Sequence, residues 1–195
     1  YFARTGLVSS SGAELPNHTQ IFSATKNQAN NSVTLIAEKN GVRLEKTYAL
    51  NKGSYVVEVK HSIKNINAQN LDATLYAELV RDGGKPSFKG KVEESSFYST
   101  FTGPAVYTDA EKFHKIDFSD IEKGKSKVPS TQPAGDGAWV AMVQHYFVSA
   151  WVPPTTYSKD LYVEKLDKNQ FRVGVKSKLD ELGVGQDKVE TFISF

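Results

Sequence analysis

Apolar and polar residues alternate with a period of two along most of this chain. Between Tyr55 and Ile63 every second residue is apolar except His61, and the residues between them are mostly polar. This alternation predicts a β-strand with one buried and one solvated face. Similar segments occur on both sides of the chain centre, at residues 31–38, 42–50, 71–79, 161–166, 170–176 and 189–195. The pattern therefore predicts a meander of long antiparallel strands.

The pair Asn40-Gly41 separates two of these segments, Asn31–Glu38 and Val42–Leu50. A tight two-residue hairpin needs two positive φ angles, which asparagine and glycine tolerate better than other residues. We therefore expect a β-hairpin that turns at Asn40-Gly41.

The longest apolar run, GAWVAMVQHYFVSAWVP, extends from Gly137 to Pro153. A run this continuous predicts one or two central strands that are covered on both faces. We expect Trp139, Met142 and Trp151 to lie in the core, because the strand pattern around them is apolar.

Helical signals are few. Thr108-Asp109-Ala110-Glu111 resembles a capping box and predicts a short helix over residues 109–115. The segment Lys123–Gly137 is rich in Lys, Ser, Pro and Gly, which predicts an exposed loop. So many strands need a second sheet to bury their apolar faces, so we expect one all-β antiparallel sandwich domain over residues 1–195, with one or two short helices.

Composition excludes several classes of function. The chain has 195 residues, 39% hydrophobic and 24% charged, with a formal net charge of +2 and no cysteine. Basic and acidic residues are interspersed, so there is no concentrated basic face and we expect no nucleic-acid partner. No segment has the roughly 18–20 apolar residues of a membrane span. Because the chain begins at Tyr1 without methionine, we expect an excised fragment of a longer protein.

Motifs for catalysis or cofactor binding are absent from the sequence. Its four histidines, at positions 18, 61, 114 and 145, have no metal-ligand spacing. No nucleophile elbow and no phosphate-binding glycine loop occurs. We expect no metal, no cofactor and no catalytic residue, and interpret His61 and His145 as strand histidines in or beside the core.

Two motifs give the chain a resemblance to a known family. YTDAEKFHKIDF, at Tyr107–Phe118, precedes the run GAWVAMVQHYFVSAWVP. Upstream, LEKTYALNKGSYVVEVKHSIKN occupies Leu44–Asn65. In this order the motifs resemble the large periplasmic domain of the membrane-protein insertase YidC of Gram-negative bacteria. Gly137-Ala138 stands where the family often has two glycines.

The resemblance implies a fold, a location and a role. The implied fold is a β-supersandwich like that of galactose mutarotases, on the periplasmic side of the bacterial inner membrane. The implied role is a non-catalytic docking platform for the Sec translocon subunits SecD and SecF, which also meets membrane-protein substrates. We expect the partner contact within Tyr98–Val152, at Tyr107, Glu111, Lys112 and Lys115. The membrane-embedded insertase core of the family lies outside this chain.

A second class of function stays open at this point. Mutarotase-like sandwiches can hold sugars, so a carbohydrate-binding or sugar-epimerising domain is the alternative. Such chemistry needs a histidine acid and a carboxylate base across one sugar ring. The pairs to test are His61 or His145 with Glu78.

Overall fold

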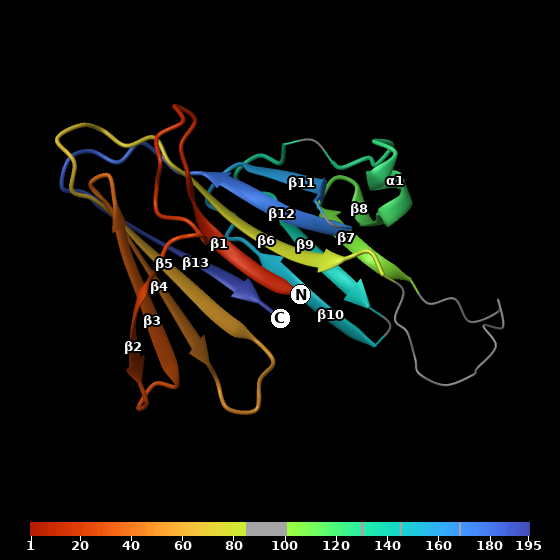
Figure 1. The fold of residues 1–195 in the computed structure, drawn as a ribbon, viewed down its shortest axis with the longest axis horizontal. Coiled ribbons are helices and arrows are strands. Elements are labelled where there is room, and N and C mark those ends of the chain that lie inside the picture. The colour runs from red at the N-terminus through yellow and green to blue at the C-terminus, as the bar shows by residue number, and fades with distance from the viewer. Residues whose placement is uncertain (85–100, 130, 145, 168) are drawn as a thin grey trace.

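The computed structural model describes residues 1–84, 101–129, 131–144, 146–167 and 169–195. Two antiparallel sheets pack face to face as a sandwich (Figure 1). The smaller sheet has the order β1-β6-β12-β11, with the strands β1 (Phe2–Val8), β6 (Thr74–Asp82), β12 (Gln170–Lys178) and β11 (Lys159–Leu166).

The larger sheet has nine strands in the order β2-β3-β4-β5-β13-β10-β9-β7-β8. Their bounds are β2 (Ser23–Asn27), β3 (Ser32–Lys39), β4 (Val42–Leu50), β5 (Val57–Asn65), β13 (Asp187–Ser194), β10 (Phe147–Val152), β9 (Ala138–Gln144), β7 (Thr102–Thr108) and β8 (Lys112–Lys115). One half of this sheet is β2-β3-β4-β5 and the other half is β10-β9-β7-β8. Strand β13 lies between the halves and pairs with β5 and β10.

The hairpin at Asn40-Gly41 forms as the sequence predicts. Asn40 and Gly41 have φ angles of 47° and 68°, and Lys39 pairs with Val42 directly across the turn. Positive φ at both central positions matches the twist of the turn to that of the strands.

The hydrophobic core lies between the two sheets. One cluster of buried side chains combines Leu75, Ala77 and Leu79 of β6 with side chains of the larger sheet. Met142 and Trp151 belong to this cluster and are only 1% and 2% exposed. Strand parity places alternate residues of β6 in this core and directs Tyr76 and Glu78 to the other face of the smaller sheet.

The run from Gly137 to Pro153 forms two strands, β9 and β10, which pair with each other from Phe147↔Gln144 to Trp151↔Val140. Trp139 departs from the expected core position. It is only partly buried and packs beside a small satellite cluster of Ala105, Ala141 and Ala150. Because β9 alternates, Trp139 lies on the face opposite to Met142, which is the outer face of the larger sheet.

The helix expected at residues 109–115 is not formed, and this expectation was wrong. The Thr108 hydroxyl does accept the backbone N–H of Glu111 at 3.0 Å, but it stabilises the turn between β7 and β8. Within the described residues the helix is α1 (Phe118–Glu122), which follows β8. None of the helical structure in these ranges has the length and apolar character needed to cross a membrane.

Candidate functional site

The residues expected to contact partners lie together on the β7–β8 hairpin, at one edge of the larger sheet. Tyr107 is opposite Phe113, and Lys115 is opposite Ala105. Glu111, Lys112 and Lys115 are exposed, and Tyr107 is partly buried. We call this hairpin, together with Trp139 on the neighbouring strand β9, the β8 edge.

An aromatic stack forms the centre of the β8 edge. The rings of Tyr107 and Trp139 are nearly parallel, with centroids 5.5 Å apart and an interplanar angle of 6°. Phe113, which is 48% exposed, also packs against Trp139, with ring centroids 5.9 Å apart and the rings tilted by 40°. The sequence reasoning missed Trp139 and Phe113 as surface residues. The available signal was strand parity, because Trp139 and Met142 are three positions apart and an odd offset places them on opposite faces of a strand.

Charged side chains surround this stack. Lys112 Nζ lies 5.9 Å from the centroid of the Tyr107 ring, and Lys115 Nζ lies 5.2 Å from that of Phe101. Glu111 Oε2 lies 3.7 Å from His114 Nε2. Aromatic faces beside exposed cations and a carboxylate offer both apolar area and charge to a protein partner.

Asp109 holds the turn of this hairpin against β9. Its carboxylate accepts the backbone N–H of Gly137 at 2.5 Å and the Tyr107 hydroxyl at 3.3 Å. Its own backbone N–H donates to the carbonyl oxygen of Gly137 at 3.1 Å. These contacts hold the turn of the hairpin against the start of β9.

A different polar cluster lies inside the sandwich, around Thr5 of β1. His61 is fully buried, with Nε2 3.1 Å from Thr5 Oγ1 and its ring edge-on to Phe192. Lys46 donates to the Thr5 carbonyl oxygen at 2.7 Å and lies 4.2 Å from the centroid of the Phe22 ring. Burial lowers the pKa of Lys46 to about 8. Burial, with the nearby charge of Lys46, lowers the pKa of His61 to about 3.

This depressed pKa predicts how stability depends on pH. As pH falls below about 6.5, the unfolded chain binds a proton at His61 while the folded protein does not, until pH approaches 3. The contribution of neutral His61 to stability is therefore full above pH 6.5 and is lost toward pH 3, at up to about 1.4 kcal/mol per pH unit. We expect the free energy of unfolding to fall by about 2 kcal/mol more between pH 7 and pH 5 in the wild type than in His61→Leu. Denaturant titrations at each pH measure this difference, and parallel curves would contradict it.

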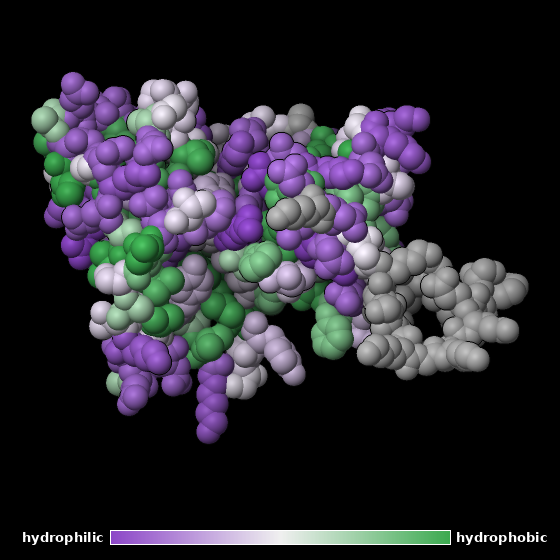
Figure 2. All heavy atoms as spheres, viewed as in Figure 1, coloured by the Kyte–Doolittle hydropathy of each residue, from purple (hydrophilic) through white to green (hydrophobic). Residues whose placement is uncertain are grey.

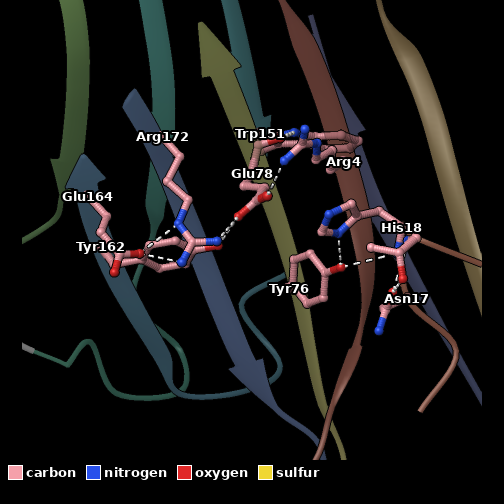
Figure 3. Close-up of polar contacts among 10 residues, drawn as sticks. Arg4, Asn17, His18, Tyr76, Glu78, Trp151, Tyr162, Glu164 and Arg172 are labelled. Atoms are coloured by element: carbon pink, nitrogen blue, oxygen red, sulfur yellow. Dashed lines mark hydrogen bonds and ion pairs between the residues drawn. The ribbon is translucent and has the colours of Figure 1, made fainter. Parts of the chain in front are cut away.

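Glu78 belongs to the smaller sheet but lies on its outer face, away from the buried cluster of Thr5, Lys46 and His61. Its side chain is 1% exposed and forms the centre of a polar network (Figure 3). Arg172 Nη1 lies 3.2 Å from Glu78 Oε2, and the Tyr162 hydroxyl donates to the same oxygen at 3.0 Å. Arg4 Nη1 lies 3.6 Å from Glu78 Oε1. Burial and the Glu78 charge raise the pKa of Tyr162, so it remains a hydrogen-bond donor.

Two glycines make room for the aromatic rings of this network. A Cβ on Gly174 would lie 2.3 Å from Tyr162 Cζ, and one on Gly6 would lie 2.7 Å from the Tyr76 hydroxyl oxygen. Tyr76 in turn lies 2.5 Å from His18 Nδ1, and burial raises the pKa of Tyr76 to about 12. The side chains therefore lie flat over the sheet and exclude water from Glu78.

The structure does not bring together His61 and Glu78, the histidine and carboxylate expected for a sugar reaction. His61 faces the core between the sheets, whereas Glu78 lies on the outer face of the smaller sheet, so this sheet separates them. His145 lies outside the described residues. Within the same part of the chain, no group of three or more His, Asp and Glu side chains is arranged to hold a metal ion.

Solved structures share the fold. A galactose mutarotase related enzyme from Lactobacillus acidophilus superimposes with a TM-score of 0.54, covering 89% of this chain and 70% of its own, at 9% sequence identity. At that identity the likeness concerns the fold alone. The all-β antiparallel class and the mutarotase-like architecture expected from the sequence are thus confirmed.

The sequence comparisons are more specific. A protein named membrane protein insertase YidC from Cupriavidus necator is 53% identical over 191 residues, which are 95% of this chain and 32% of that protein. The protein of the same name from Ralstonia nicotianae is 45% identical over 191 residues, again 95% of the chain and 32% of its relative. The chain therefore spans about a third of the length of these curated relatives. The family model described as YidC periplasmic domain matches residues 1–195. The chain belongs to the YidC periplasmic domain family.

Proposed function

We propose that this chain is a non-catalytic periplasmic domain of a membrane-protein insertase and that the β8 edge is its docking surface. The parent protein lies in the bacterial inner membrane, and the partners are the Sec translocon accessory subunits SecD and SecF. Segments of membrane-protein substrates are a second class of partner for the same edge.

The observation that carries this proposal is the stacked pair of Tyr107 and Trp139 on the outer face of the larger sheet, beside its edge strand β8. Aromatic residues flanked by charges are enriched where proteins bind one another. β8 is the last strand of its sheet, and an edge strand offers backbone groups to an extended segment of a partner. Lys112 and Lys115 add charge that steers association with an acidic surface.

The sugar-active alternative has less support. It rests on the likeness in fold, which does not transfer an activity. The histidine and carboxylate that we regarded as its best candidates, His61 of β5 and Glu78 of β6, lie on opposite sides of the smaller sheet.

Charge reversal on the hairpin tests the docking surface. A triple variant reverses the sign of the charge at three exposed positions: Glu111→Lys, Lys112→Glu and Lys115→Glu. Attraction between these side chains and a partner then becomes repulsion. We expect SecF that copurifies with the full-length insertase to fall at least about tenfold, equivalent to about 1.4 kcal/mol. Unchanged copurification would remove the docking surface from this edge.

A matched control keeps the change in net charge and moves it elsewhere. Glu58→Lys, Lys60→Glu and Lys26→Glu alter exposed residues of β5 and β2, in the other half of the larger sheet. We expect wild-type copurification from this variant. An equal loss in both triple variants would indicate a general charge effect and would contradict a specific docking surface.

A further inference from the structure

The larger sheet extends past the smaller sheet on the side of β1. Strand β1 is an edge strand of the smaller sheet and lies over β4 and β5, where Thr5 contacts Lys46 and His61. Figure 1 shows β2, β3 and β4 projecting beyond β1, with the inner face of these strands turned toward the viewer. Part of the inner face of the larger sheet therefore lies outside the sandwich.

Apolar side chains on this projecting face are only partly covered. Val33 pairs with Tyr48, and Tyr48 pairs with the buried core residue Val59, so all three point to the inner face. Val33 and Tyr48 are partly buried. Leu50 points the same way and is 52% exposed, whereas Leu44 on the same face of β4 is fully buried. Figure 2 shows hydrophobic side chains gathered over β3, β4 and β5 on this side of β1.

We call this uncovered inner face the open shelf. Its members are inner-facing residues of β2, β3 and β4 that are exposed or partly buried, namely Ala24, Val33, Leu35, Tyr48 and Leu50.

The free edge of β1 borders the open shelf and carries unpaired backbone groups. Leu7 donates its N–H to the Pro16 carbonyl oxygen at 2.9 Å, and the Thr5 carbonyl oxygen accepts a hydrogen bond from Lys46. The backbone groups of residues 3, 5 and 7 therefore point away from β6. Among the described residues, the N–H and C=O of Ala3 and the N–H of Thr5 have no hydrogen-bond partner. Ala3 shares a face with buried Thr5 but is exposed, so the sandwich is open beneath it.

The charge of the open shelf is positive. The inner-facing positions of β2, β3 and β4, strands that the structure describes completely, carry Lys26, Lys39 and Lys46 and no acidic residue. Lys39 pairs with Glu14 at 2.9 Å, and Lys46 is buried beneath the Phe22 ring. Lys26 is exposed. A partner with a carboxylate complements this charge.

An extended polypeptide fits both features of this region. A strand added to β1 continues its ladder through Ala3 and Thr5 and lays every second side chain on the open shelf. The apolar floor then covers the apolar side chains of the added strand, and Lys26 meets a carboxylate on the same face. A lipid or a sugar lacks the regular series of donors and acceptors that matches a strand edge.

We propose that the open shelf and the free edge of β1 bind an extended apolar polypeptide segment that carries a carboxylate, by addition of a β-strand. This site goes beyond the docking surface proposed above, because β2 and β8 are opposite ends of the larger sheet. A segment held in this way has one edge paired, which limits its association with other strands.

Fluorescence anisotropy with the 195-residue chain tests the peptide chemistry. The probe is fluorescein-labelled Thr-Val-Thr-Val-Thr-Val-Thr-Glu-Thr, whose valines and glutamate share one face of a strand. Two further peptides are N-methylated, one at the valines and one at the internal threonines, which removes the donors on either edge. We expect one of these two to bind at least about tenfold more weakly than the unmodified peptide. Equal affinity of all three would overturn strand addition.

Two variants of the chain locate the binding site. Ala3→Pro removes only an N–H that points away from β6, a position where an edge strand accepts proline. Leu50→Glu places an acid on the open shelf at an exposed position. We expect each to weaken peptide binding at least about fivefold. Circular dichroism checks that both keep the fold, and the exposure of Leu50 keeps the test valid if Ala3→Pro unfolds.

Val184→Glu is the matched control for Leu50→Glu. Val184 is also an exposed apolar residue, at 58%, and adjoins Gly185, which pairs with Asn65 at the end of β5 opposite to Leu50. We expect wild-type affinity from this variant. An equal loss in both glutamate variants would indicate a general charge effect and would overturn the placement on the open shelf.

Two further results would overturn the proposal. One is the absence of saturable binding to the wild type up to about 1 mM protein. The other is a dimer of the peptide-free chain in sedimentation that Ala3→Pro abolishes, because a second copy would then occupy the edge. The experiment contains no Sec subunit, so its outcome does not depend on the β8 edge.

Discussion

Replacing Trp151 with alanine is expected to lower the free energy of unfolding by about 3–5 kcal/mol. The Trp151 ring is 2% exposed and fills the space between the two sheets, edge-on to Phe192 at 6.5 Å. Its Nε1–H donates to the Glu78 backbone carbonyl oxygen at 3.2 Å, so alanine also leaves that acceptor without this donor. Denaturant unfolding followed by circular dichroism measures the loss. The expected change is a large part of the roughly 5–15 kcal/mol that stabilises a typical domain.

Trp139→Ala is the matched control for this prediction. Trp139 belongs to the same apolar run but lies on the outer face, where it stacks on Tyr107. We expect it to lower the free energy of unfolding by only about 1 kcal/mol, the contribution of an aromatic pair, while reducing SecF copurification. Equal stability losses in the two variants would contradict the assignment of the two tryptophans to opposite faces.

Gly174→Ala is expected to lower the free energy of unfolding by about 1–3 kcal/mol, although it adds a single methyl group. The new Cβ would lie 2.3 Å from Tyr162 Cζ, so the ring must move. A displaced Tyr162 loses its hydrogen bond to Glu78 and its contact with the Arg172 guanidinium, which lies 5.5 Å from the ring centroid. Chemical denaturation of the two proteins at pH 7 measures the loss.

A double-mutant cycle separates this clash from other effects of the substitution. In a Tyr162→Ala background, Gly174→Ala meets no ring. We expect it to be neutral or to stabilise by about 0.5–1 kcal/mol there, because glycine is unfavourable inside a strand. An equal loss in both backgrounds would show that Tyr162 is not the cause.

The residues of the β8 edge were chosen from the family resemblance and the polar segment that carries it, and their contact with partners stays a prediction. Tyr107, Glu111, Lys112 and Lys115 were expected to act together, and the structure brings them onto one hairpin. The secondary structure expected there was wrong. A hydroxyl that accepts the N–H three residues later occurs both in a capping box and in a turn, so Thr108 and Glu111 do not distinguish the two.

Trp139 shows the limit of reading an apolar run. Every residue from Ala138 to Val143 is apolar, so hydrophobicity does not say which face of the strand meets the core. The other sheet decides it, because the smaller sheet covers the face of β9 that carries Val140 and Met142.

The sequence alone determined the strands between residues 31 and 79 and those after residue 137, the turn at Asn40-Gly41, the burial of Met142 and Trp151, and the family resemblance. These depend on alternation over a few residues and on motifs contiguous in the chain. Only the tertiary structure decided that Arg4, Glu78 and Arg172 form one network and that both chain ends flank β10. The three network residues come from β1, β6 and β12, which are far apart in the sequence but adjacent in one sheet. Such pairing follows from burying the apolar faces of all strands at once, which no local segment encodes.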